Sequence, residues 1–180
     1  MNLNELEQLY LKRQSCREFS EKDVPDELIQ KICELALLAP SACNAQPWKL
    51  IAVKGEKKDA LAKAVQGMGM NKFVSSAPVL IAVLEGKSNL AAKTGGKLGD
   101  SDFVHNDIGI MTAHLVLAAE AAGLGTCIIG WRNEKTIRSV LALDEKARIP
   151  HVVALGYPPE GYEVRQKKRK PLDETYKLMK

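Results

Sequence analysis

The chain has 180 residues, of which 46% are hydrophobic, and 26 basic side chains against 22 acidic ones give a net charge of +4. This length and composition are typical of one domain, here residues 1–180, that buries its own core without disulfides or metal ions. The sequence contains no apolar run of bilayer length, and "MNLNELEQLY" does not resemble a signal peptide. We therefore expect a cytoplasmic protein that does not enter a membrane.

The cysteines and histidines show no spacing typical of a disulfide framework or a metal site. Cys16, Cys33, Cys43 and Cys127 include no C-x-x-C pair, and the chain is not of the short secreted type that depends on disulfides. The three histidines lack the i, i+4 spacing of a helical zinc pair. We expect free thiols and no metal.

The hydrophobic pattern predicts helices and strands that alternate along the chain. Short β-branched runs such as "APVLIAVLEG" are typical of buried strands, whereas "FVHNDIGIMTAHLVLAAEAA" is nearly apolar on all sides, as a central buried helix would be. The predicted elements, in chain order, are a helix over 26–39, a strand over 48–55, a helix over 56–66, a strand over 77–86, a helix over 103–122, an extended piece over 126–131, a helix over 134–143 and a strand over 151–158. Such a mixture around one sheet predicts an α/β or α+β sandwich.

Several common motifs of nucleotide binding and hydrolysis are absent. "GLGTCI" has Ile128 at the third glycine position and follows a predicted helix, whereas a dinucleotide fingerprint follows a strand. "GGKLG" lacks the spacing of a Walker loop, and no G-x-S-x-G occurs. These observations exclude a Rossmann site, a P-loop and a nucleophile elbow.

Three groups of polar residues remain that we do not expect to lie in the hydrophobic core. They are Arg13, Ser15 and Arg17 in "RQSCREFS", Ser41, Asn44 and Gln46 in "PSACNAQPW", and Lys167 and Arg169 in "RQKKRK". Guanidinium groups bind phosphate bidentately, and Ser, Asn and Gln can satisfy the polar edges of a planar heterocycle. Each group alone has an ordinary alternative: a solvated helix face, a turn, and a solvated or nucleic-acid-binding tail.

Taken together, these motifs resemble those of the FMN-dependent nitroreductase family. In order, they are R-x-S-x-R-x-F at 13–19, A-P-S-x-x-N-x-Q-P-W at 39–48, an alanine-rich helix running into G-L-G-T at 123–126, and K-x-R at 167–169. The resemblance implies an α+β fold with a central, mainly antiparallel sheet flanked by helices. It also implies a homodimer with FMN at the interface, in which the C-terminal extension, about 158–180, lies on the partner subunit.

The resemblance also implies a set of cofactor contacts. Arg13, Gln14 and Ser15 would hold the phosphate and the ribityl chain, and Arg17 the pyrimidine edge of the flavin, where negative charge builds on reduction. The remaining implied contacts are Pro40, Ser41, Ala42, Asn44 and Gln46 from the other subunit, Lys72 at the pyrimidine edge, the backbone of Ile129 and Gly130 near flavin N5, and Lys167 and Arg169 at the phosphate.

The activity that the resemblance implies is electron transfer from NADH or NADPH, through FMN, to nitroaromatic, quinone or flavin acceptors in a ping-pong mechanism. No side chain is expected to act as a catalytic acid or base. One alternative is a specialised flavin enzyme of the dehalogenating or flavin-fragmenting type. Another is a non-enzymatic protein that binds nucleic acid or another partner through its basic tail, although we expect no nucleic-acid partner.

Two features add to this interpretation. The stretch 87–102 is short, loose and glycine-containing where many family members carry a longer insertion, so we expect a mobile lid there. Cys16, Cys43 and Cys127 all lie within the flavin motifs. Packing as small apolar residues is the expected reason, with redox sensing as the alternative.

Overall fold

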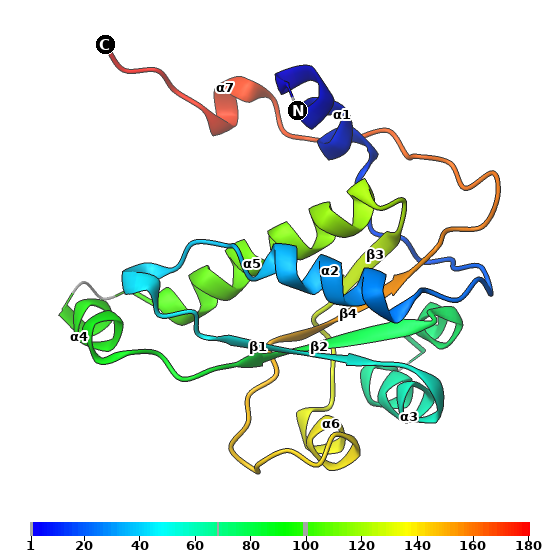
Figure 1. Ribbon diagram of the computed structural model, residues 1–180. Coiled ribbons are helices and arrows are strands. Elements are labelled where there is room, and N and C mark those ends of the chain that lie inside the picture. Colours follow the sequence, from blue (N-terminus) through cyan, green and yellow to red (C-terminus); the bar gives the residue numbers. More distant parts are fainter. Residues whose placement is uncertain (1, 68, 99–100) are drawn as a thin grey trace.

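The structure is a computed structural model that describes residues 2–67, 69–98 and 101–180. Figure 1 shows one sheet enclosed between two layers of helices. The elements in chain order are α1 (Leu3–Lys12), α2 (Asp26–Ala36), η1 (Ala42–Asn44), β1 (Trp48–Val53), α3 (Gly55–Val65), η2 (Lys72–Ser76), β2 (Val79–Glu85), α4 (Leu90–Leu98), α5 (Phe103–Ala121), β3 (Gly125–Ile129), α6 (Glu134–Val140), β4 (His151–Gly156) and α7 (Leu172–Thr175). Among the described residues, no helix combines the length and the apolar character needed to cross a bilayer.

The sheet has four strands in the order β1-β2-β4-β3, and each neighbouring pair is antiparallel. In the centre, Ile81 of β2 lies opposite Ala52 on one side and Val153 of β4 on the other. β4, the last strand in sequence, lies between β2 and β3, so β1 and β3 form the two edges. The predicted α+β fold with a mainly antiparallel sheet is confirmed.

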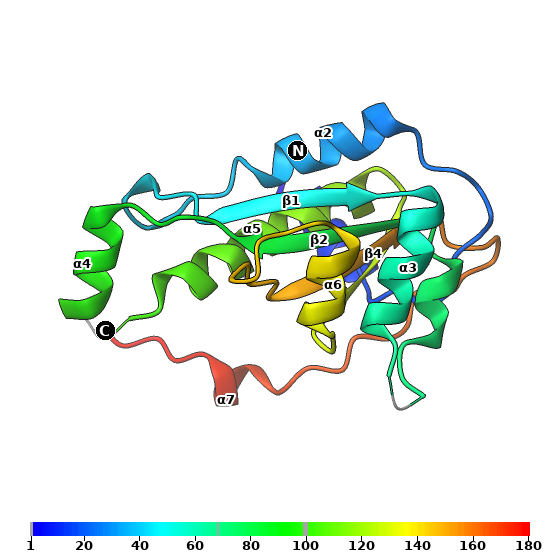
Figure 2. The same ribbon diagram turned by 90° about the horizontal axis from the view of Figure 1, so that it is seen from below.

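The two faces of the sheet bury two separate cores. In β2, Leu80 and Ala82 join the core that includes side chains of α3 and α6, whereas Val79 and Ile81 join the core that includes α2 and α5. Successive side chains of a strand point to opposite faces. Because helices cover both faces (Figures 1 and 2), residues 79–84 of β2 are all buried, which explains their uninterrupted apolar sequence.

α5 is the long central helix that the sequence predicts. Met111 and Leu115 are fully buried against the sheet, and Gly123 follows the helix with a φ of 75°, the left-handed conformation typical of a helix end. The opposite side of α5 exposes small and apolar residues, including Gly109 and Ile110, which is 42% exposed. The outer side of α5 therefore combines apolar residues with the exposed polar residues His105 and Asn106.

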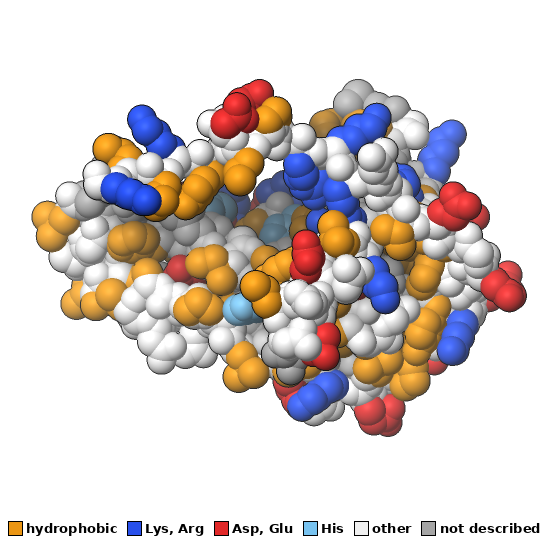
Figure 3. Space-filling model, turned by 90° about the horizontal axis from the view of Figure 1, so that it is seen from above, with side chains coloured by type: hydrophobic (Ala, Val, Ile, Leu, Met, Phe, Trp, Pro, Cys, Tyr) orange, Lys and Arg blue, Asp and Glu red, His pale blue; other side chains and the backbone are white. Residues whose placement is uncertain are grey.

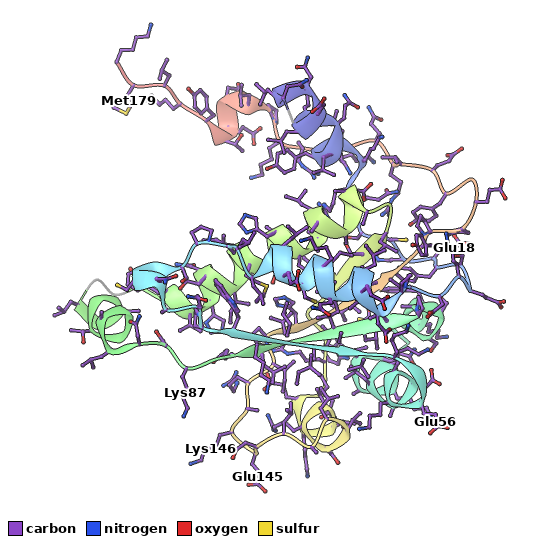
Figure 4. The ribbon with its side chains drawn as sticks, viewed as in Figure 1. Glu18, Glu56, Lys87, Glu145, Lys146 and Met179 are labelled. Atoms are coloured by element: carbon purple, nitrogen blue, oxygen red, sulfur yellow. The ribbon has the colours of Figure 1, made fainter. Side chains whose placement is uncertain are left out.

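The two ends of the chain run together beside the sheet. Ser15 forms an isolated parallel bridge with Thr126 of β3, and the segment after β4 turns at Gly161, where φ is 73°. It then passes alongside the segment 13–17 and α1 (Figure 1). The C-terminal end projects from the body, with Met179 near its tip (Figure 4).

The structure differs from the predicted elements in several places. The helix predicted over 26–39 ends at Ala36 and is followed by a turn, and α7 was not predicted. α1 was not predicted, although Asn2 and Glu5 form a capping box at its start. The expectation of a loose loop over 87–102 is wrong for Leu90–Leu98, which form α4; Asn89 accepts a hydrogen bond from the Ala92 amide at 2.8 Å and so caps this helix. Residues 99 and 100 of that stretch lie outside the described residues.

Candidate functional site

A cavity of about 570 Å³ lies between the N-terminal segment 13–17 and the tail segment 165–169. Its lining residues are Arg13, Gln14, Ser15, Arg17, Arg165, Gln166, Lys167, Lys168 and Arg169. None of these residues is acidic. Figure 3, which looks down on this side of the molecule, shows Lys and Arg side chains gathered beside a hollow. The charge of the lining suits an anion. We call this cavity the cation pocket.

The edge of the sheet fixes one wall of the cation pocket. The Cys16 amide donates to the Thr126 carbonyl at 2.8 Å, beside the bridge between Ser15 and Thr126. The buried Cys16 side chain lies against Gly125, where an added Cβ would approach Cys16 Sγ to 2.7 Å. Segment 13–17 is therefore held at the start of β3.

The second wall is joined to the first by side chains. Gln14 is buried, and its Nε2 donates to the Glu163 carbonyl at 2.9 Å. Arg165 donates to Gln14 Oε1 from its backbone amide at 3.1 Å and from Nε at 3.0 Å, and donates from Nη2 to the Ser15 carbonyl at 2.6 Å. Lys167 Nζ donates to the Arg13 carbonyl. The Gln14 side chain thus binds the tail, whereas the sequence predicts a cofactor contact at that position.

The cations of the pocket repel one another. Burial lowers the pKa of Lys167, and the neighbouring charges of Arg13, Arg169 and Arg165 lower it further, whereas Glu120 of α5 opposes the change. A bound anion would relieve this repulsion. The donor set therefore fits a phosphate group such as that of FMN.

The residues predicted in "PSACNAQPW" form a compact, strained loop. Gln46 donates from its amide to Ser41 Oγ at 3.0 Å and from Nε2 to Asn44 Oδ1 at 3.0 Å. Cys43, Asn44 and Gln46 adopt positive φ angles of 51°, 49° and 46°. Left-handed conformations of non-glycine residues cost free energy and persist where surrounding contacts hold them. The strain supports the prediction that this loop is functional.

Asp107 of α5 holds this loop in place, and the sequence analysis did not identify it. Its carboxylate, 4% exposed, accepts a hydrogen bond from the Ala42 amide, with N to O distances of 3.1 and 3.2 Å. On the other side of the loop, Asn89 Nδ2 donates to the Cys43 carbonyl at 2.9 Å. The sequence did contain a signal for Asp107, because it is an acidic residue in a predicted helix that is otherwise nearly apolar.

The predicted backbone contacts at Ile129 and Gly130 lie at the far end of β3. Ile129 is buried, whereas Gly130 is exposed and its carbonyl accepts from Arg132 Nη1 at 2.7 Å. An added Cβ at Gly130 would meet no described atom within 4 Å, so the fold of this chain does not itself require glycine there. The ring of Trp131 packs against Gly67, which brings the turn before Lys72 beside the end of β3.

Within one chain, the predicted site residues do not all lie at one place. Asp107, which holds the 40–46 loop, and Glu120, which lies near Lys167, are thirteen positions apart on α5. At 1.5 Å rise per residue, their positions are about 20 Å apart along the helix. The cation pocket contains Arg13, Gln14, Ser15, Arg17, Lys167 and Arg169 of the predicted set, and the 40–46 loop lies toward the other end of the helix.

A larger hollow lies away from these residues. It has a volume of about 660 Å³ between α2 and β1, and Ile29, Cys33, Leu37 and Trp48 contribute to its largely apolar lining. It includes none of the predicted site residues. Within the described ranges, no group of three or more His, Cys, Asp or Glu side chains could hold a metal ion.

The fold is an α+β sandwich with a pocket lined by basic side chains at one edge of its sheet. Comparison of the sequence with family models gives a match to the nitroreductase family over residues 10–69 and 66–157. The chain therefore belongs to the nitroreductase family, whose members are oxidoreductases. The family predicted from the sequence is confirmed.

Individual proteins agree with this assignment. The chain is 33% identical over 181 aligned residues to an NADH dehydrogenase of Thermus thermophilus, covering 84% of this chain and 86% of the relative. It is 26% identical to the iodotyrosine deiodinase of Hydra vulgaris, covering 90% of this chain and 68% of the relative. The crystal structure of a nitroreductase family protein from Streptococcus pneumoniae superposes with a TM-score of 0.81 at 27% identity, covering 97% of this chain and 100% of that protein.

Proposed function

We propose that the protein is an FMN-dependent oxidoreductase that transfers electrons from NADH or NADPH to nitroaromatic, quinone or flavin acceptors. The observation that carries this proposal is the cation pocket, in which two distant segments of the chain present basic side chains to one cavity. Arg13, Lys167 and Arg169 would bind the phosphate of FMN. A hydrogen bond to a charged group contributes about 1.5 to 3 kcal/mol, so these three residues would favour a flavin that carries a phosphate over one that does not.

The other predicted residues have roles that fit their positions. Arg17 lies on the exposed side of the pocket, where it can stabilise negative charge on the pyrimidine edge. The backbone at Ile129 and Gly130, together with Lys72 on the neighbouring turn, would contact the ring. Bound FMN would supply the redox chemistry, accepting a hydride from NAD(P)H and reducing the acceptor in a second, ping-pong half-reaction.

We also propose that the protein is a homodimer. Asp107, which holds the 40–46 loop, and Glu120, which lies near Lys167, are about 20 Å apart along α5, so we propose that a second copy brings that loop to the same flavin. The uncovered side of α5, with Gly109 and Ile110, offers an apolar surface for such a contact. FMN would then lie between the two chains and contact both.

The end of the tail supports a dimer independently. Leu172, Tyr176, Leu178 and Met179 are 71%, 57%, 64% and 81% exposed, although large apolar side chains are usually buried. We propose that the C-terminal extension lies on the partner subunit, where these side chains would be covered.

An absorbance spectrum of the purified protein tests the proposal. We expect flavin bands near equal molarity with the chain, bleached by NADH or NADPH in the absence of oxygen. Arg13→Met or Lys167→Met should weaken FMN binding by about 10- to 100-fold, as loss of one charged hydrogen bond predicts. Lys146→Met, on the opposite side of the molecule (Figure 4), is the matched control and should bind FMN normally. A protein that stays colourless after incubation with FMN would refute the proposal.

A dehalogenase is the second candidate, because the similarity to an iodotyrosine deiodinase extends over 90% of this chain. Anaerobic release of halide from a halogenated phenol by the reduced protein, without turnover of quinones or nitro compounds, would favour it. The nucleic-acid alternative has less support, because Arg165 and Lys167 of the tail donate to the chain's own backbone.

A further inference from the structure

Arg165 lines the cation pocket but directs its donors to the protein. Nε and Nη2 donate to Gln14 Oε1 and to the Ser15 carbonyl at 3.0 and 2.6 Å. Its backbone amide donates to the same Gln14 oxygen at 3.1 Å. One residue of the tail therefore makes three hydrogen bonds to two adjacent residues of the opposite wall. It differs in this from Arg17 and Arg169, whose side chains donate no hydrogen bond across the pocket within the described residues.

The positive charge of Arg165 repels other cations of the pocket. It lies close enough to Lys167 to disfavour the protonated form of that side chain, as Arg13 and Arg169 also do. Like charges in one site repel. A neutral donor could join the two walls without this repulsion, so the guanidinium must offer something else. It provides a planar group with donors in two directions, which fixes the spacing and the orientation of the walls.

The two walls hold the residues that would bind phosphate. Arg13 and Ser15 lie on one wall and Lys167 and Arg169 on the other. The hydrogen bond from Arg165 to the Ser15 carbonyl joins the two walls, as does the hydrogen bond from Lys167 to the Arg13 carbonyl. A change in the separation of the walls would move one pair of cations relative to the other.

We propose that Arg165 is a positioning residue for the flavin phosphate: with Gln14 as its partner, it holds the tail against segment 13–17 so that Arg13, Lys167 and Arg169 converge on one anion. This inference rests on the proposed function, because the anion is taken to be the phosphate of FMN. Arg165 itself does not bind the phosphate.

The test compares two ligands that differ only in the phosphate. Dissociation constants of full-length protein for FMN and for riboflavin are measured for the wild type and for Arg165→Met, Arg165→Lys and Gln14→Leu. We expect the preference for FMN over riboflavin to fall at least 10-fold in all three variants, while riboflavin binding changes less than 3-fold. Lys170→Met removes a positive charge from the same exposed tail, outside the pocket lining, and should keep the preference.

Three other outcomes would overturn the inference, each for a different reason. Full recovery of the preference in Arg165→Lys would show that charge alone matters, because an ammonium group cannot reproduce the two-directional contact. Equal losses for both ligands would show a general structural role. If Arg165→Met does not fold, Gln14→Leu and Arg165→Lys give the same comparison. A wild-type protein that binds neither flavin would refute the proposed function, and this inference with it.

Discussion

His151, the first residue of β4, lies half-buried beside α5 in a neutral form. Thr112 Oγ1 lies 2.8 Å from the Ile108 carbonyl and forms a hydrogen bond of 2.8 Å with His151 Nε2. Burial, and secondarily the charge of Arg132, lower the pKa of His151 to about 4.

This pKa predicts a loss of stability in mild acid. Between pH 6.5 and about 4, the unfolded chain protonates His151 whereas the folded chain does not, so the free energy of unfolding falls as the pH falls. The full effect is about 3 kcal/mol. Urea denaturation between pH 7.5 and pH 4.5 measures it, with His151→Asn as the comparison. The variant should show a shallower pH dependence, and equal slopes would contradict the prediction.

At the scale of single residues, the sequence predicts those site residues that belong to a short motif. Arg13, Ser15, Lys167 and Arg169 line one cavity as expected, because the residue types themselves suit an anion. Arg165 was missed, and the contact of the Gln14 side chain with the tail was not expected. Both depend on a contact between residues about 150 positions apart, which no local pattern encodes.

The strained 40–46 loop provides a prediction at the scale of elements. Asp107 of α5 holds the loop through the Ala42 amide, and removal of a buried acceptor leaves that donor unpaired at a cost of about 1 to 3 kcal/mol. Asp107→Ala should lower the free energy of unfolding by this amount and weaken FMN binding by about 10-fold, because the loop would relax from its left-handed conformations.

The conservative variant distinguishes the hydrogen bond from the charge. Asp107→Asn keeps an oxygen that can accept from the Ala42 amide, so it should recover most of the FMN affinity. Equilibrium unfolding and flavin titration of both variants give the comparison. If Asp107→Ala loses stability but binds FMN normally, the loop has no role in the flavin site.

Elements with a strong periodic pattern were predicted well. The helix expected over 56–66 is α3 (Gly55–Val65), and the one expected over 103–122 is α5 (Phe103–Ala121). The position of β4 between β2 and β3 could not be predicted, because this order depends on pairing between strands distant in sequence. α4 was missed because two glycines in its short sequence weaken the helical signal.

At the scale of the whole molecule, two of the exposed apolar surfaces among the described residues are ones that the proposed dimer would cover. One is the outer side of α5 and the other is the apolar end of the tail. The tail segment 163–169 binds its own chain through Gln14, Ser15 and Arg13, whereas the segment after Lys170 projects freely (Figure 1). The tail therefore divides into a part that completes the cation pocket and a part available to a partner.

Two truncations separate these parts. A chain ending at Lys170 keeps every residue of the cation pocket and loses the exposed apolar residues of the tip. Each large apolar side chain buried in a dimer contributes roughly 1.5 to 3 kcal/mol, so loss of two or more should weaken dimerisation by about 100-fold or more. A chain ending at Tyr157 also loses Arg165, Lys167 and Arg169, so it should in addition fail to bind FMN.

Sedimentation and flavin titration over a range of protein concentrations distinguish the two truncations. If the partner supplies the 40–46 loop, the chain ending at Lys170 should bind FMN normally at concentrations where it is still dimeric and lose affinity as it dissociates, because each flavin then loses the contacts from the second chain. The chain ending at Tyr157 should not recover at any concentration. If the chain ending at Lys170 dimerises normally, the tail tip does not lie on the partner subunit. If that chain binds FMN equally well after it has dissociated into monomers, one chain holds the flavin alone.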